Sequence, residues 1–179
     1  MSPDRNKKRQ SRPRKQSRQN HSYDFVGQYY YAIDEKGRVN IPAKFRKAVQ
    51  ANREDWFKIT LGLDRCIWVM PPEQWRIVQE KLNELPFELA DPRYYHRMIH
   101  SYASNSKIDA QGRIVLPRNL LEKLKIEKDV VIVGMHNHIE IWKHETHQEY
   151  LNKGPSAYET GPYEEAAEKI YRYILKKSS

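Results

Sequence analysis

Aspartate, glycine and arginine recur at one spacing in two ten-residue segments of this chain. The segments begin at Ile33 and Ile108, 75 positions apart, and five of their ten positions are identical. In each segment the aspartate can accept hydrogen bonds from amides of its own turn, and the glycine can adopt the positive φ of a tight turn. An arginine follows at the start of the next strand. Because a two-stranded ribbon fits the major groove and arginine can donate two hydrogen bonds to one guanine, the repeat favours nucleic-acid recognition.

The same residues also allow a purely structural interpretation. Asp34 and Arg38, and likewise Asp109 and Arg113, can pair across each turn and simply stiffen the junction between two strands. A single copy would favour that interpretation, because surface ion pairs and aspartate-capped turns are common. The duplication weakens it, since two equivalent arginine-bearing hairpins suit a two-part recognition surface.

The elements around the first motif follow from local patterns. An aromatic and β-branched run up to Ile33 predicts a strand, and the alternation of Val39 and Ile41 with polar residues predicts another. Pro42 stands where a first helical residue would be, and we expect a helix to follow from Ala43 to about Gln50, with Phe45 and Val49 facing the core. Strands over 56–61 and 66–70 should form a hairpin with Gly62 at its bend.

Two helices separate the repeats. One opens at Pro71-Pro72 and places Trp75, Val78, Leu82 and Leu85 on one face; the other begins at Asp91, an N-cap followed by Pro92, with Tyr95, Met98, Ile99 and Tyr102 on one side. The second unit then repeats the first, with a helix through Leu124, a strand over 129–133, a bend at Gly134 and a strand over 138–142. His147 corresponds to Trp75 in a degraded helix.

Charge and composition suggest four segments. Residues 1–22 form a basic tail in which we expect disorder, because no apolar residue follows Met1. Residues 1–20 carry eight Lys or Arg against one Asp, so this tail holds +7 of the net charge of +9. The remaining segments are 23–90 and 91–151, which hold the two repeats and their helices, and 152–179, a polar linker followed by an amphipathic helix over 162–177.

Several chemistries are disfavoured. Cys66, the single cysteine, cannot form an intrachain disulfide and falls within an apolar strand, where a buried inert thiol is the default. Zinc binding by His136, His138, His144 and His147 is a weak hypothesis, because no cysteine or well-placed carboxylate completes the set. We find no phosphate loop, nucleophile elbow, signal peptide or membrane span, and therefore expect a cytoplasmic protein that is not an enzyme.

The order of these motifs resembles the MraZ family. The resemblance covers about residues 23–150 and rests on the segments 25–27, 34–46, 62–64, Trp75, 109–113 and 133–142. It implies a mixed α+β fold in which two tandem swapped-hairpin units, similar to AbrB, form a pseudo-symmetric β-barrel with peripheral helices. It also implies a transcriptional regulator of the nucleoid that binds double-stranded DNA at G-rich direct repeats upstream of the division and cell wall gene cluster. The resemblance further implies a ring-shaped homo-oligomer, octamer or dodecamer, with no cofactor and no small-molecule ligand.

The resemblance also assigns roles to residues. Arg38 and Arg113 become the primary DNA contacts, Lys36 and Gln111 the supporting contacts, and Asp34, Gly37, Asp109 and Gly112 the residues that set the turns. Since glutamine replaces lysine in the second copy, we expect the first repeat to matter more. Two alternatives remain open: an RNA-binding protein that uses Tyr29, Tyr30 and Tyr31, and a structural ring without sequence-specific DNA recognition. The basic tail could serve as an added nucleic-acid arm, as a nuclear-type targeting stretch or as solubilising disorder, and the resemblance to a bacterial family disfavours targeting.

Overall fold

A computed structural model describes residues 23–153 of the chain. The predicted basic tail over 1–22 and the predicted helix over 162–177 lie outside the described residues. Within the described part of the chain, none of the helices combines the length and apolar composition needed to cross a bilayer.

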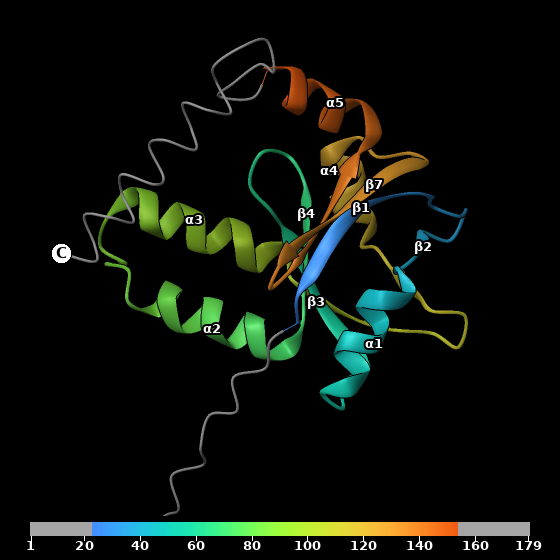
Figure 1. Ribbon diagram of the computed structural model, residues 1–179. Helices are drawn as coiled ribbons and strands as arrows, with labels where there is room; N and C mark the ends of the chain where they lie inside the picture. Colours follow the sequence, from blue (N-terminus) through green and yellow to red (C-terminus); the bar gives the residue numbers. More distant parts are fainter. Residues whose placement is uncertain (1–22, 154–179) are drawn as a thin grey trace, which may run out of the picture.

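Each repeat contributes strands and helices in a similar order (Figure 1). The first unit comprises β1 (Phe25–Ala32), β2 (Arg38–Asn40), α1 (Ala43–Ala51), β3 (Trp56–Leu61), β4 (Ile67–Met70) and α2 (Pro72–Asn83). Helix α3 (Ala90–Ser101) follows. The second unit comprises β5 (Ser104–Lys107), β6 (Arg113–Val115), α4 (Arg118–Leu124), β7 (Asp129–His136), β8 (Ile139–Lys143) and α5 (His144–Lys153).

The strands form two antiparallel sheets. Six of them pair in the order β1-β7-β8-β4-β3-β5, and β2 pairs with β6 in a separate two-stranded sheet. The first strand of each repeat therefore pairs with a strand of the other repeat, and the order reads the same from either edge when the repeats are interchanged. Because the edge strands β1 and β5 do not pair with each other, the large sheet is open and the expected barrel is not confirmed.

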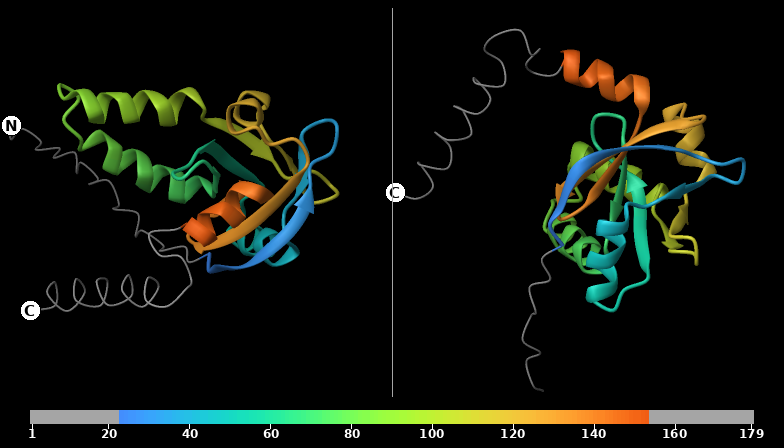
Figure 2. Two further views of the ribbon diagram at one scale, coloured as in Figure 1. Left: turned by 90° about the horizontal axis from the view of Figure 1, so that it is seen from above. Right: turned by 45° about the vertical axis from the view of Figure 1, so that its right-hand side comes forward.

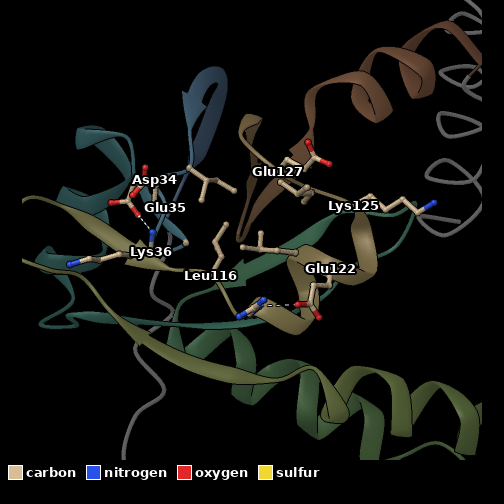
Figure 3. Close-up of a pocket in the computed structure, with 12 residues that line it drawn as sticks. Asp34, Glu35, Lys36, Leu116, Glu122, Lys125 and Glu127 are labelled. Carbon is tan, nitrogen blue, oxygen red and sulfur yellow. Dashed lines mark hydrogen bonds and ion pairs between the residues drawn. The ribbon is translucent and has the colours of Figure 1, made fainter.

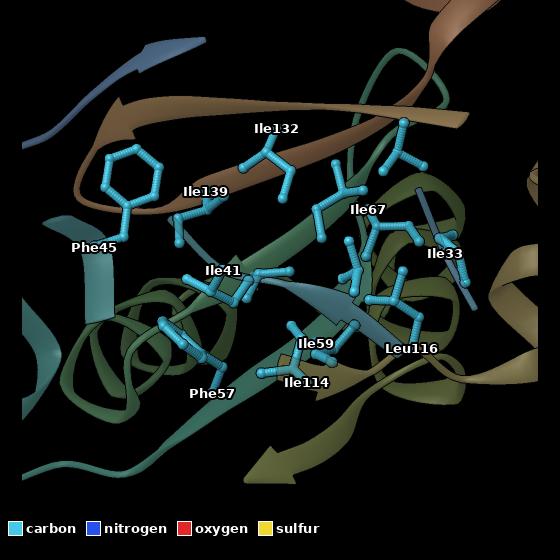
Figure 4. Packing of buried hydrophobic residues seen from close by; sticks show 14 of the residues in the cluster. Ile33, Ile41, Phe45, Phe57, Ile59, Ile67, Ile114, Leu116, Ile132 and Ile139 are labelled. Carbon is cyan, nitrogen blue, oxygen red and sulfur yellow. The ribbon is translucent and has the colours of Figure 1, made fainter. Parts of the chain in front are cut away.

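The core lies between the two repeats and draws on both. Figure 4 shows Ile41, Phe45 and Ile59 of the first unit packed among Ile114 and Ile132 of the second. All five side chains are buried. Burying an aliphatic or aromatic side chain of this size stabilises the fold by about 1.5–3 kcal/mol, so the shared core ties the repeats together.

The strand pattern predicted around each motif is confirmed. Val39 and Ile41 point inward while Asn40 is exposed, and in the second repeat Ile114 is buried while Val115 is exposed. This alternation is the period of a strand with one solvated face. It leaves the arginine at the head of each strand on the partly exposed side.

The helices cover different parts of the sheet. Helices α2 and α3 run side by side and contact β3, whereas α5 contacts β7 and β8 (Figure 2). A second buried cluster of Met70, Trp75, Leu82 and Ile99 fills the space beneath α2 and α3. His147 is buried on α5, as Trp75 is on α2, in keeping with the correspondence predicted from the repeat.

The predicted bend at Gly134 is wrong. Gly134 lies inside β7, opposite Gly27 of β1, and a Cβ on it would come within 2.6 Å of the Phe25 carbonyl carbon. The positive φ at the end of β7 falls instead on His136, at 62°. Close approach of two strands, and not a turn, therefore explains the glycine at position 134.

Gly62 lies in the β3–β4 connection, as predicted, but crowding and not a positive φ accounts for the glycine. The positive φ values of the β3–β4 connection belong to Asp64 and Arg65, whereas a Cβ on Gly62 would lie 2.6 Å from the Cys66 Sγ and 2.5 Å from the Trp68 ring. Residues across the hairpin leave no room for a side chain at position 62, so local sequence rules about glycine in bends do not identify the reason for this glycine.

Helix ends also differ from expectation. Helix α3 begins at Ala90 with Leu89 as N-cap, so Asp91 lies in the first turn instead of capping it. Helix α2 ends at Asn83, which leaves Leu85 exposed and outside the predicted apolar face. Pro42 is the N-cap of α1 and not its first helical residue. Apart from the exposure of Leu85, these shifts of one or two residues leave the predicted packing unchanged.

Candidate nucleic-acid interface

The two Asp-x-x-Gly-Arg turns lie side by side because β2 and β6 pair with each other. Arg38 is opposite Val115, and Asn40 is opposite Arg113. Two further backbone hydrogen bonds extend this pairing in a symmetric way: Ile41 N donates to Gly112 O at 3.0 Å, and Leu116 N donates to Gly37 O at 2.8 Å. Both turns project from the side of the molecule opposite α2 and α3 (Figure 1).

The aspartate builds each turn. Asp34 Oδ1 accepts hydrogen bonds from the backbone N–H of Lys36 and of Arg38, both at 3.0 Å. In the second copy, Asp109 Oδ1 accepts from the N–H of Gln111 and Arg113, both at 2.9 Å. The aspartate thus accepts the same pair of backbone hydrogen bonds in both copies of the turn.

Glycine completes each turn. Gly37 has φ 74° and Gly112 has φ 80°, in the left-handed region that glycine enters without steric cost. Each glycine N–H donates to the carbonyl of the aspartate in its own turn at 2.9 Å. The assignment of these glycines to the turns therefore rests on backbone geometry.

Hydrogen bonding to the carboxylates lowers their pKa values. The pKa of Asp34 lies below the ordinary aspartate value, chiefly because the Arg38 backbone N–H donates to the charged form. The pKa of Asp109 is lowered chiefly by the Arg113 side chain. Both carboxylates are therefore ionised at neutral pH and hold their turns in the charged form.

The arginine side chains fold back onto these aspartates. Arg38 Nε donates to Asp34 Oδ2 at 2.7 Å. Arg113 donates to Asp109 Oδ2 from Nε at 2.9 Å and from Nη2 at 2.8 Å, and its Nη1 lies 3.7 Å from Asp34 Oδ2. The pairing required by the structural interpretation is thus present. Both arginine side chains nevertheless keep exposed surface, 29% for Arg38 and 20% for Arg113.

The supporting residues lie at the tips of the turns. Lys36 and Gln111 are both exposed, at equivalent positions two residues before the arginines. Their long side chains are therefore free to meet a ligand that approaches the paired turns. The lysine adds a positive charge to the first turn only.

The surroundings of the two turns differ, which the sequence did not predict. Leu121 of α4 lies next to Gly37, whereas Arg46 of α1 lies next to Gly112 and donates from Nε to Ile41 O at 3.0 Å. Arg46 and Leu121 occupy equivalent positions, 75 residues apart. The 75-residue offset would have paired them, but only the structure shows that the arginine covers the opposite turn.

A hollow of about 880 Å³ lies beside the first turn (Figure 3). Leu116 points into it between the turn and α4, and charged side chains of both signs, including Asp34, Lys36, Glu122 and Lys125, surround its mouth. The mixed charge does not concentrate positive potential in the hollow itself. The basic groups of the first turn that face solvent are Lys36 and Arg38.

Comparison with known proteins places the chain in a family. The model of a family described as "MraZ protein, putative antitoxin-like" matches twice, at residues 25–98 and 99–167. This chain belongs to the MraZ family. The two matches correspond to the two copies of the repeat, and the second extends beyond residue 150, so the MraZ match reaches further toward the C-terminus than the motifs alone indicated.

Curated MraZ relatives share much of the sequence. A protein of Carboxydothermus hydrogenoformans named transcriptional regulator MraZ is 40% identical over 151 residues, which cover 84% of this chain and 99% of the relative. A protein of the same name from Natranaerobius thermophilus is 42% identical over 135 residues, covering 75% of this chain and 92% of the relative. Another from Heliobacterium modesticaldum is 41% identical over 151 residues, covering 84% and 99%.

The remaining candidate sites of this MraZ family member are less suited to chemistry. Cys66 is buried, and burial together with the nearby Glu140 carboxylate raises the pKa of its thiol. His138 and His147 are drawn into packing against Trp68 and Trp142, respectively. Among residues 23–153, no group of three or more His, Cys, Asp or Glu side chains could hold a metal ion.

The tyrosine run offers little surface for base stacking. Tyr29 packs edge-on against Phe45, with ring centroids 5.3 Å apart, and Tyr31 is half-buried. Tyr30 is 60% exposed and packs edge-on against His144. One exposed ring of the three is a weaker platform than the RNA-binding alternative requires.

Proposed function

We propose that this chain is a transcriptional regulator that binds double-stranded DNA through its paired Asp-x-x-Gly-Arg turns. The observation that carries the proposal is the β2–β6 pairing, which places two arginine-bearing turns side by side on one surface. The shared name of its MraZ relatives, transcriptional regulator, supports the same function. We further propose that the protein acts in the cytoplasm at the nucleoid and is not an enzyme.

The proposed target is a set of G-rich direct repeats upstream of the division and cell wall gene cluster. Arginine suits guanine because its guanidinium can donate to O6 and N7 together. In this proposal Arg38 and Arg113 lie at the DNA surface, Lys36 and Gln111 support them, and Asp34, Gly37, Asp109 and Gly112 hold the turns. The lysine gives the first turn the larger share of the affinity.

The proposed assembly is a ring of identical subunits that binds successive repeats. Linked binding sites act at high effective concentration, so several weak turns together produce tight binding. The exchanged pairing of β1 with β7 and of β5 with β3 supports two swapped-hairpin units, spanning residues 23–90 and 91–151. In a structural ring without DNA recognition, the ion pairs of Arg38 and Arg113 would only stiffen the turns.

Fluorescence anisotropy tests the function directly. Wild-type protein and the Arg38→Ala variant are titrated onto a duplex with G-rich direct repeats and onto a scrambled duplex, at two salt concentrations. We expect Arg38→Ala to weaken binding to the repeats by about 1–3 kcal/mol per engaged subunit and to leave the oligomer intact. Arg97→Ala is the matched control, because Arg97 is an exposed arginine on α3, away from the turns.

Each alternative predicts a different result. Equal, salt-sensitive binding to both duplexes would assign the binding to general electrostatics, with the basic N-terminal segment as the main source. Preference for single strands or stem-loops would favour the RNA-binding alternative. Dissociation of the oligomer in Arg38→Ala, with no duplex binding by the wild type, would favour the structural ring.

A further inference from the structure

Four charged side chains of the paired turns form a row of alternating charges that runs across both repeats. Its order is Arg38, Asp34, Arg113, Asp109. Arg38 Nε donates to Asp34 Oδ2 at 2.7 Å, Arg113 Nη1 lies 3.7 Å from the same oxygen, and Arg113 Nε and Nη2 donate to Asp109 Oδ2. Arg38 lies at one end of this row, and Asp109 lies at the other.

The two arginines therefore differ in what remains available to a ligand. Arg113 lies between two carboxylates: its Nε and Nη2 face Asp109, and its Nη1 faces Asp34. Arg38 shares its single carboxylate with Arg113 and uses only Nε for it. Among residues 23–153, neither Nη of Arg38 makes a hydrogen bond.

Guanine recognition distinguishes the two geometries. A bidentate contact needs two N–H groups of one guanidinium pointing in one direction. Arg38 can present both of its Nη groups while its Nε stays on Asp34. Arg113 could offer a comparable pair only by leaving a carboxylate, and a guanidinium between two anions carries less excess positive potential toward DNA. The lysine in the first turn and the glutamine in the second point to the same division.

We propose that Arg38 is the base-reading arginine of each subunit, and that Arg113 is a positioning residue that holds Asp34 and thereby orients Arg38. This inference rests on the proposed DNA-binding function and assigns different work to its two arginines. The β2–β6 pairing fixes the distance between the turns, so the Arg113 guanidinium can reach Asp34 from the neighbouring repeat. Each subunit then reads bases through one turn, and the other turn holds it in place.

A double-mutant comparison tests this division. Dissociation constants are measured by anisotropy for wild type, Arg38→Ala, Arg113→Ala and the double variant. Each protein is titrated onto the repeat duplex and onto a duplex whose repeat guanines are replaced by adenines. The readout is the discrimination ratio between the duplexes. We expect Arg38→Ala to lower it at least tenfold, Arg113→Ala to lower it less, and Arg113→Ala to have no further effect once Arg38 is absent.

Conservative variants separate contact from positioning. Lysine keeps the charge but loses the planar pair of donors. Arg38→Lys should therefore lose discrimination nearly as Arg38→Ala does, whereas Arg113→Lys, still able to pair with Asp34, should restore most of what Arg113→Ala loses. Arg113→Lys also serves if Arg113→Ala does not fold. As a direct readout, NMR signals of the Arg38 side chain should shift on addition of the repeat duplex, and those of Arg113 should stay nearly unchanged.

The inference would be overturned if the losses of discrimination in Arg38→Ala and Arg113→Ala multiplied in the double variant, because both arginines would then read bases independently. Equal losses for Arg38→Lys and Arg113→Lys, or equal NMR shifts at both arginines, would overturn it in the same way. In each of these cases the wild type still discriminates, so the proposed function stands. A wild type that does not distinguish the duplexes overturns the proposed function and, with it, this division of roles.

Discussion

The two turn glycines form a matched pair for a stability measurement that requires no DNA. Alanine at position 37 or 112 must adopt a φ of 74° or 80°. A left-handed conformation costs a non-glycine residue about 1–2 kcal/mol, and the loss of chain entropy in the unfolded state offsets about 0.4–1 kcal/mol of that. The shared backbone cost is therefore about 1 kcal/mol for each substitution.

The side chains next to the glycines make the two costs unequal. A Cβ on Gly37 would meet Leu116 O at 3.3 Å, a contact that a small shift can relieve. A Cβ on Gly112 would lie 2.4 Å from Arg46 Nη1, so the guanidinium must move and give up its hydrogen bond to Ile41 O. Losing that bond costs about 0.5–1.5 kcal/mol. We expect Gly112→Ala to destabilise the fold by about 2 kcal/mol and Gly37→Ala by about 1 kcal/mol.

Equilibrium urea unfolding followed by tryptophan fluorescence, at one protein concentration, measures both variants. The control is Gly112→Ala introduced into an Arg46→Ala background, where the clash and the hydrogen bond are both absent. In that background, the cost of Gly112→Ala should fall to the value measured for Gly37→Ala. The reasoning is refuted if Gly37→Ala costs as much as Gly112→Ala, or if removing Arg46 leaves the cost of Gly112→Ala unchanged.

Three further predictions concern charge and burial. Folding lowers the pKa values of Asp34 and Asp109, so the two carboxylates should stabilise the fold fully above the unfolded pKa of about 4. This contribution should decline as pH falls through the folded pKa values. The urea midpoint of unfolding should therefore decline less over this pH range in the double variant Asp34→Asn/Asp109→Asn than in the wild type. Lys36→Gln should lower the salt dependence of repeat binding by about one ion per engaged subunit and Gln111→Lys should raise it by about one, measured as the slope of log affinity against log salt. Because burial raises the pKa of the Cys66 thiol, a thiol reagent at neutral pH should label Cys66 at the rate of unfolding and label it rapidly in denaturant.

Local features of the fold were predictable from the sequence because they depend on neighbouring residues. The aspartate-capped turns need only the spacing of Asp34, Gly37 and Arg38, and the buried positions of β2 follow from alternation over four residues. Helix α1 was placed within a residue by Phe45 and Val49, which lie one turn apart and are both buried. The same turn and strand patterns recur in the second unit, so each local prediction rested on two copies of the sequence pattern.

Long-range features were not predictable in the same way. Strand periodicity indicates which face is buried, but it does not identify the partner strand, so the exchange of β1 and β5 between repeats could not be derived from it. The glycines at 62 and 134 illustrate the same limit of local rules. Their function depends on atoms of Cys66 and Phe25, which approach only when the strands have paired.

The candidate site combines both kinds of information. Composition alone makes the two turns nearly equivalent, apart from Glu35 and Lys36 in the first and Ala110 and Gln111 in the second. Once β2 pairs with β6, however, a two-fold arrangement of like charges would place each arginine equally near the aspartate of the other turn. The structure departs from that symmetry, since Arg113 reaches Asp34 and Arg46 covers Gly112, where Leu121 lies at the equivalent position beside Gly37. Duplication therefore supplies two copies of one turn, and a few substitutions outside the motif give the copies different surroundings.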